Sequence, residues 1–378
     1  MNNKIFVSKP FLPPIEKYIH YVQQVWDNCY LTNNGPLVRE LEKKLKAYLG
    51  VKHIFFVSNG TIALQLAIKA LNLKKTIITT PFSFAATTNA IIWEKCTPVF
   101  ADIDPSTLCI DPDKIEKLIT KETEAILAVH IYGIPCNIKK INILAKKYNL
   151  KVIYDAAHAF GTKIGNDSIC IFGDISTISF HAVKLFHTGE GGAIITNDDI
   201  LAKKIALYRN FGLEGDNITY PGINAKNSEL HAALGLANFP YIQKLIDKRK
   251  LLIQTYDNIL KNSTIFRPII PDNISYNYSY YPIIFNTEKE TLHIYKLLQK
   301  KNIYAKRYFY PSLNTLSFVN GNSCPISESI SKRILCLPLY HDLSLKMIKK
   351  IAKIIIQNRM TINRPRQKSL QIHSFKQL

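Results

Sequence analysis

The chain has 378 residues, 47% of them hydrophobic, which is enough for a large α/β domain and a smaller second domain. Its formal net charge is +21, but the lysines are spread along the chain without the arginine-rich stripe or the basic–aromatic alternation of nucleic-acid-binding proteins. No stretch reaches the roughly 18 apolar residues of a membrane helix, and the start is too soon polar for a signal peptide. The seven cysteines lack the spacing of a zinc site or a disulfide framework. We therefore expect a soluble, cytoplasmic protein that binds neither nucleic acid nor a metal.

The first two thirds of the chain alternate short β-rich runs with helical patterns. Residues 54–57 form the first strand candidate, and a helical pattern follows over 62–71. Further strand candidates lie at 76–79, 98–100, 125–129, 152–154, 177–180 and 193–196. Apolar strands separated by helices predict a mostly parallel sheet that is covered by helices on both faces. The fold class is therefore α/β, with a three-layer α/β/α large domain.

The pattern changes after about residue 245. A lysine-rich helix is expected over 240–262, a strand over 281–285, and further helices over 288–301 and 344–358. This succession predicts a small C-terminal α+β domain. We place the large domain at 1–245 and the small domain at 246–360. A basic tail with few apolar anchors, predicted to be disordered, follows over 361–378.

Residues 58–61, Ser-Asn-Gly-Thr, lie between the first strand and the first helical pattern of the sheet region. Backbone N–H groups and the helix dipole make such a junction a natural seat for a phosphate. Gly60 allows close approach to the backbone, and Thr61 adds a hydroxyl donor. An ordinary helix N-cap explains the same four residues as well.

Two polar residues follow the strand at 152–154, which is apolar on both faces. Asp155 should lie at the carboxyl end of the sheet, where ligands bind in open α/β folds. A partly buried carboxylate needs a partner, and a protonated pyridine nitrogen would serve. The alternatives are a turn residue for Asp155 and a plain helix residue for His158.

Lys184 follows the strand candidate at 177–180 and precedes a glycine-rich turn at 189–192. Such a lysine can form an imine with an aldehyde, although a single lysine of this kind is more often a surface residue. The combination is more specific. A phosphate seat, an aspartate at a strand end and a lysine about 30 residues later are the three parts that a pyridoxal-phosphate site requires.

With these motifs in this order, the chain resembles the DegT/StrS family of sugar aminotransferases, within the fold-type-I superfamily of pyridoxal-phosphate enzymes. The resemblance runs from Gly35 to Leu339 and includes residues 80–87, 102–104, 130–133, 179–184, 190–192 and 222–226. It implies an aspartate-aminotransferase-like fold. It also implies pyridoxal 5'-phosphate as cofactor, with pyridoxamine phosphate as its amine form.

The resemblance implies catalytic roles for three residues. Lys184 would hold the cofactor covalently and move protons, and Asp155 would pair with the pyridine nitrogen. His158 would hydrogen-bond the phenolic oxygen of the cofactor. Because Lys184 has to be neutral to accept a proton, we expect its pKa to be lowered in the site.

Further residues would bind the cofactor. The resemblance implies that Phe84 stacks on the cofactor ring and that Gly60, Thr61 and Ser179 hold its phosphate. Asn224 lies in a loop that reaches the phosphate of the neighbouring subunit in this family. The resemblance therefore implies a homodimer with shared active sites.

The implied reaction transfers an amino group from glutamate to a nucleotide-linked keto-sugar. Residues 9–14, 31–36 and 81–84 most resemble enzymes that convert dTDP-4-keto-6-deoxy-D-glucose to dTDP-4-amino-4,6-dideoxy-D-glucose. Amination of another sugar position or with another nucleotide is an alternative, as is a sugar dehydratase, although dehydratases of this family carry histidine in place of Lys184. A non-enzymatic basic protein that binds nucleic acid is a remote alternative. The sequence departs from many relatives at Asn314, where they have histidine, and at residues 240–241 (Pro-Tyr), where they often have Gln-Leu.

Overall fold

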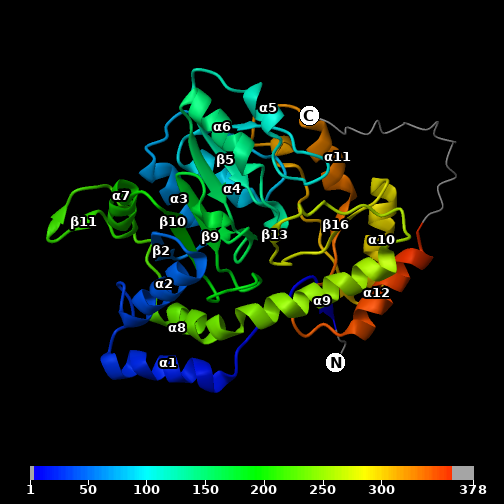
Figure 1. The fold of residues 1–378 in the computed structure, drawn as a ribbon, viewed down its shortest axis with the longest axis horizontal. Coiled ribbons are helices and arrows are strands. Elements are labelled where there is room, and N and C mark those ends of the chain that lie inside the picture. The colour runs from blue at the N-terminus through cyan, green and yellow to red at the C-terminus, as the bar shows by residue number, and fades with distance from the viewer. Residues whose placement is uncertain (1–3, 360–378) are drawn as a thin grey trace.

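The computed structural model describes residues 4–359, and its centre is a seven-stranded sheet (Figure 1). The strand order is β2-β10-β9-β6-β5-β3-β4. All neighbouring strands pair in parallel except β10, which is antiparallel to both β2 and β9. The bounds are β2 (His53–Val57), β3 (Thr76–Thr79), β4 (Thr97–Phe100), β5 (Thr123–Val129), β6 (Lys151–Asp155), β9 (Ile175–Ser179) and β10 (Gly192–Thr196). The mostly parallel α/β sheet that the sequence predicts is confirmed.

Two apolar cores cover the two faces of this sheet, because successive side chains of a strand point to opposite faces. In β10, Ile194 packs in one core, whereas Ala193 and Ile195 pack in the other. Helices α3 (Gly60–Ala70), α4 (Ala85–Trp93), α6 (Ile138–Tyr148) and α7 (Asp199–Arg209) contribute to the first core. Helices α1 (Ile15–Asn28), α2 (Pro36–Leu49) and α8 (Glu229–Asn238) contribute to the second. The sheet is thus the middle of three layers.

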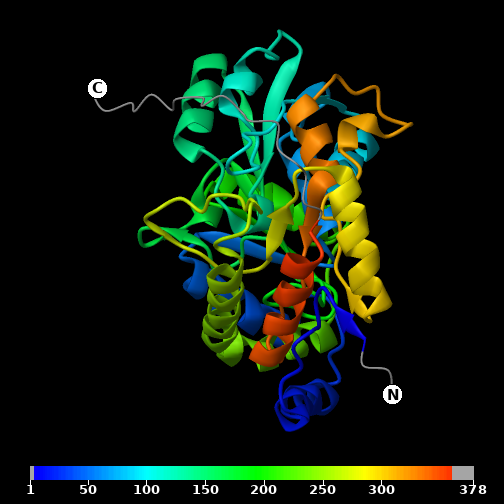
Figure 2. The ribbon, with the colours of Figure 1, turned by 90° about the vertical axis from the view of Figure 1, so that its right-hand side faces the viewer.

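The C-terminal part has a third core of its own. Helix α9 (Ile242–Leu260) continues from α8 and runs across to this part of the molecule (Figure 1). There it packs against α12 (Leu345–Gln357), beside α10 (Glu288–Lys300) and the antiparallel strands β14 (Pro282–Ile284) and β16 (Ile334–Cys336) (Figure 2). Strand β1 (Ile5–Phe6) pairs in parallel with β15 (Ile303–Tyr304), so the N-terminal segment joins the C-terminal part. The boundaries at 245 and 360 stay a prediction.

Short elements complete the fold. They are α5 (Pro112–Glu116), α11 (Pro325–Arg333), the hairpin of β11 (Leu213–Glu214) and β12 (Asn217–Ile218), the small sheet of β7 (Lys163–Ile164), β8 (Asp167–Ser168) and β13 (Ile274–Ser275), and four 3-10 turns at Ile131–Gly133, Ile169–Ile171, Phe239–Tyr241 and Leu313–Thr315. Residues 240–241 belong to the turn between α8 and α9. The tail predicted over 361–378 lies outside the described residues.

Side chains define where many of these helices begin. A polar side chain before the first turn accepts a hydrogen bond from a backbone N–H that has no helical partner. This is the case for Asn59 at α3, Asp198 at α7, Ser228 at α8, Thr287 at α10 and Ser344 at α12. None of the helices in residues 4–359 is long and apolar enough to cross a membrane.

Candidate active site

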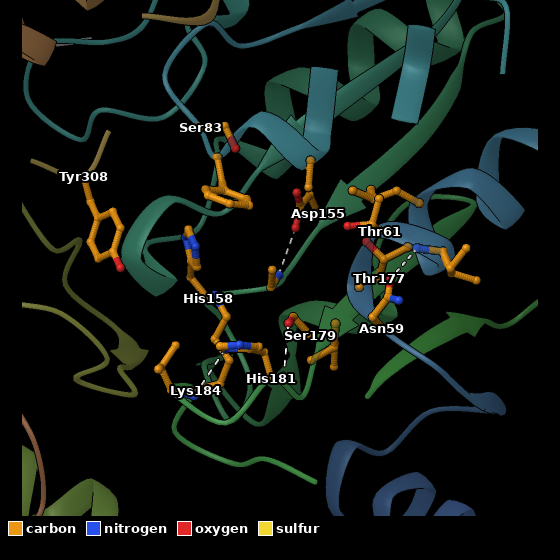
Figure 3. Close-up of a pocket in the computed structure, with 18 of the residues that line it drawn as sticks. Asn59, Thr61, Ser83, Asp155, His158, Thr177, Ser179, His181, Lys184 and Tyr308 are labelled. Carbon is orange, nitrogen blue, oxygen red and sulfur yellow. Dashed lines mark hydrogen bonds between the residues drawn. The ribbon is translucent and has the colours of Figure 1, made fainter. Parts of the chain in front are cut away.

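A cavity of about 610 Å³ opens at the carboxyl ends of β6 and β9. The N-termini of α3 and α4 border it, and residues 280 and 308–309 enter it from the C-terminal part. Figure 3 shows Tyr308 on this side of the cavity. Seven of the eight residues that the sequence singles out line this cavity, namely Gly60, Thr61, Phe84, Asp155, His158, Ser179 and Lys184. The three separate motifs therefore meet in one place.

The N-terminus of α3 points into the cavity. The Asn59 side chain accepts a hydrogen bond from the Ile62 N–H at 2.9 Å, which starts the helix at Gly60. A Cβ at Gly60 would lie 3.0 Å from the Ser179 Cβ, so a larger residue at this position would have to displace Ser179. A Cβ at Gly192 would lie 2.5 Å from the Asn59 backbone, which is why β10 can run so close to the helix start. The first N–H groups of the helix have no helical partner and carry its positive dipole end, so this junction is suited to an anion.

Asp155 ends β6 with its carboxylate buried in the cavity wall. One carboxylate oxygen accepts from the Thr87 hydroxyl at 2.9 Å and the other accepts from the Ala157 N–H at 3.0 Å. The Thr87 oxygen also lies 2.9 Å from the Ser83 hydroxyl. Burial raises the pKa of Asp155, while its hydrogen bonds and Lys184 oppose the increase. Both recorded hydrogen-bond partners of this carboxylate are neutral, so the site suits a cationic group there.

His158 lies in the turn after β6 rather than in a helix. Its Nδ1 accepts from the Tyr132 N–H at 3.4 Å, and its ring stacks on Phe309 with centroids 5.4 Å apart. Burial, and then the charge of Lys184, hold the pKa of His158 well below its usual value. The imidazole is therefore neutral near pH 7. Because Nδ1 accepts, the proton is on Nε2, which can donate to a ligand oxygen.

Lys184 extends from the loop after β9 into the cavity (Figure 3). Burial of the amine lowers the pKa of Lys184 to about 8, against the smaller opposing effect of Asp155. A lowered pKa agrees with the expectation from the sequence that the Lys184 amine has to be neutral to accept a proton. The amine donates a hydrogen bond to the Tyr280 hydroxyl at 3.3 Å.

Sequence reasoning missed two tyrosines that line the cavity, Tyr280 and Tyr308, and Thr87, which supports Asp155 by a hydrogen bond. The aromatic run over 276–281 immediately before β14 is the only sequence signal for Tyr280, and it indicates packing as readily as a site. Thr87 lies on the first helical turns after Phe84, and no pattern marks it as a partner of Asp155.

Two residues discussed from the sequence lie elsewhere: Asn224, the eighth predicted site residue, and Asn314, where the sequence departs from the family pattern. Asn224 is exposed, on the loop between β12 and α8, and does not line the cavity. Asn314 is buried outside the cavity, where its amide donates to the Asn322 carbonyl at 3.0 Å and to Glu328 at 2.7 Å. Asn314 therefore ties its loop to α11. Within residues 4–359 there is no group of three or more His, Cys, Asp or Glu side chains that could hold a metal ion.

The fold is shared with solved sugar aminotransferases. Among solved structures, the chain is similar to Helicobacter pylori PseC, an aminotransferase involved in the biosynthesis of pseudoaminic acid. The TM-score is 0.87 and the identity 30%, over 94% of this chain and 99% of that one.

Sequence comparison supports the same class. A dTDP-4-amino-4,6-dideoxy-D-glucose transaminase of Shigella dysenteriae is 42% identical over 94% of this chain and 99% of its own length. A GDP-perosamine synthase of Escherichia coli O157:H7 is 32% identical over 92% of this chain and 97% of its own. The profile of the DegT/DnrJ/EryC1/StrS aminotransferase family matches residues 15–356. The chain belongs to this family, and the resemblance that its sequence motifs indicate is confirmed.

Proposed function

We propose that this protein uses pyridoxal phosphate to transfer an amino group from glutamate to dTDP-4-keto-6-deoxy-D-glucose. The observation that carries the proposal is the meeting of Lys184, Asp155 and the α3 N-terminus in one cavity. The dTDP-4-amino-4,6-dideoxy-D-glucose transaminase at 42% identity supports the sugar. The formal charge of +21 suits a substrate that carries a diphosphate.

The residues present fit pyridoxal phosphate. The buried Asp155 carboxylate has only neutral recorded partners and would pair with a protonated ring nitrogen. Nε2 of His158 can donate to the phenolic oxygen, and the largely exposed Phe84 ring can stack on the cofactor ring. Gly60 and Thr61 would hold the phosphate at the helix start, with Ser179 beside them. When bound there, the cofactor supplies an electron sink for the carbon next to an amino group.

In the proposed function Lys184 transfers the protons. In its neutral form the amine would accept a proton from the α-carbon of the amino donor, and in its protonated form it would act as the acid that returns it. A pKa of about 8 leaves a substantial neutral fraction near physiological pH. The presence of a lysine also favours transamination over dehydration, because the resemblance to the family implies histidine at this position in its sugar dehydratases.

A direct test is to incubate the purified chain with pyridoxal phosphate, glutamate and dTDP-4-keto-6-deoxy-D-glucose, and to look for the amino sugar by mass spectrometry. The protein should be yellow, and the product should have the mass of the keto-sugar with its carbonyl oxygen replaced by an amino group and one hydrogen. A Lys184→Ala variant is the control and should form no product. The GDP-linked 4-keto-6-deoxy sugar should be assayed in parallel, because the GDP-perosamine synthase relative supports the alternative nucleotide. Faster turnover of the GDP-sugar would show that the proposed nucleotide is wrong, but it would not change the proposed type of reaction.

We also propose a homodimer in which Asn224 reaches the phosphate seat of the other subunit. The hairpin of β11 and β12 extends away from the body of the chain (Figure 1), and Asn224 follows it on an exposed loop. Five large hydrophobic side chains of this region are exposed, namely Phe211, Leu213, Ile218, Tyr220 and Ile223. Burial of such side chains against a second copy would remove them from water. Light scattering should give twice the mass of the chain.

A further inference from the structure

The amine of Lys184 has a specific hydrogen-bond partner that lies far away in the sequence. Lys184 Nζ donates to the Tyr280 hydroxyl oxygen at 3.3 Å, and the two residues are 96 positions apart. No other side-chain hydrogen bond of this amine is recorded in the described part of the chain. Tyr280 belongs to the segment that leads into β14, so the C-terminal part supplies this contact.

The backbone around Tyr280 is held from two sides. Arg249 on α9 donates to the carbonyl of Ser279 at 2.9 Å. The Asn277 amide donates to the carbonyls of His158 at 2.7 Å and Phe160 at 3.0 Å. The segment is therefore tied both to α9 and to the turn that carries the candidate catalytic histidine.

The ring of Tyr280 is packed by other rings. Its centroid lies 5.0 Å from that of His158, 5.5 Å from that of Tyr132 and 6.0 Å from that of Tyr308. Rings at these separations and tilts attract one another. The position of the Tyr280 hydroxyl is thus set by its surroundings and does not depend on Lys184.

We propose that Tyr280 is a positioning residue for Lys184: its hydroxyl receives the lysine amine whenever the amine is not bonded to the cofactor and keeps it inside the cavity. This inference rests on the proposed function, in which the amine is released once per half-reaction and must act from a defined place. A lysine side chain is flexible and has many rotamers, and a misplacement of about 1 Å can cost a large factor in rate. A fixed acceptor on a packed ring restricts that freedom.

The hydroxyl is suited to this role because it stays neutral. Burial raises the pKa of Tyr280 above its usual value, so the phenol keeps its proton at physiological pH. Removal of the hydroxyl takes a hydrogen-bond acceptor from the protonated amine. The neutral amine loses less stabilisation, because its hydrogen bond to the hydroxyl carries no charge. The midpoint of Lys184 protonation should therefore fall by about one unit in Tyr280→Phe, a tenfold change in the equilibrium. Other ionisable side chains also line the cavity, namely Asp155, His158, His181, Glu190 and Tyr308.

The experiment measures the protonation of Lys184 itself. Full-length wild type and Tyr280→Phe are labelled with acetic anhydride over a range of pH, both freed from cofactor and saturated with pyridoxamine phosphate. Acetic anhydride reacts with the neutral amine, so the extent of Lys184 labelling, read by peptide mass spectrometry, gives the midpoint. Tyr308→Phe is the matched control, because it removes a hydroxyl from the same cavity wall that has no recorded bond to Lys184.

A midpoint about one unit lower in Tyr280→Phe, with Tyr308→Phe unchanged, supports the proposal. An unchanged midpoint in Tyr280→Phe, or an equal shift in both variants, overturns it. Circular dichroism checks the fold. If the phenylalanine variant does not fold, Tyr280→Met removes the same hydroxyl and fills the space with a flexible side chain. A wild-type chain that binds no cofactor refutes the proposed function, while the cofactor-free titration still decides whether Tyr280 holds the amine.

Discussion

The Asp155→Asn substitution separates the charge of the carboxylate from its shape. In the wild type, the two carboxylate oxygens accept from Thr87 and from the Ala157 N–H. An asparagine can keep its oxygen on Ala157 and donate its NH₂ to the Thr87 oxygen, because Thr87 can turn its own proton toward Ser83, 2.9 Å away. The variant should therefore fold normally.

The substitution should weaken the binding of the cofactor. A hydrogen bond to a charged group contributes roughly 1.5–3 kcal/mol, which corresponds to a roughly 10- to 150-fold weaker binding of pyridoxal phosphate. Most of the activity should also disappear, because an amide cannot stabilise a positive charge on the ring nitrogen, and the unprotonated ring is a weaker electron sink.

The assay is a titration of cofactor-free protein with pyridoxal phosphate, followed by absorbance, together with the amino-transfer rate. Asp102→Asn is the matched control. Asp102 is also a buried aspartate that follows a strand of the sheet, but it caps α11 through the N–H groups of Ile326 and Ser327, at 2.9 Å each. The control should lose stability and keep its affinity for the cofactor. If Asp155→Asn binds pyridoxal phosphate as tightly as wild type and turns over at a similar rate, Asp155 is a structural residue.

Four further predictions address the lysine, the subunit interface and the fold. Borohydride reduction and peptide mapping should place the cofactor on Lys184, and label on another lysine would show that the assignment is wrong. In the proposed function Lys184 acts in its neutral form, and its pKa is about 8, so the amino-transfer rate should rise up to tenfold per pH unit below pH 8 and level off above it. A flat profile below pH 8 would contradict this role. Asn224→Ala should bind the cofactor weakly, and this affinity should be measured first. Mixing Asn224→Ala with Lys184→Ala should then form heterodimers that have one intact site and more activity than either variant alone. Heterodimers without recovered activity would show that Asn224 serves its own subunit. Glu229 is buried and accepts from two N–H groups at the start of α2, at 2.8 and 3.1 Å, so Glu229→Gln should lower the free energy of unfolding by about 1.5–3 kcal/mol in urea. Glu40→Gln is the control and should change it little, because the half-buried Glu40 side chain makes only a surface ion pair with Lys44.

The parts of the site that sequence reasoning found share a local signature. Gly60 begins a helix directly after a strand, and Asp155 ends one. Lys184 follows shortly after β9. Parallel strands bring their carboxyl ends to the same edge of a sheet, so residues at three strand ends meet without any knowledge of the packing. The strand and helix bounds of the C-terminal part are also close to the predicted ones, as in α10 (Glu288–Lys300) and α12 (Leu345–Gln357).

What the sequence by itself determined is therefore the class of fold, the family, and the residues whose chemistry depends on a strand end or a helix start. Only the tertiary structure showed that Thr87 supports Asp155, that Tyr280 reaches Lys184 across 96 positions, and that Asn314 points away from the cavity. These contacts depend on how the C-terminal part and the helices pack against the sheet. Packing joins residues with no periodic relation in the chain, so no pattern of spacing or polarity could have located them.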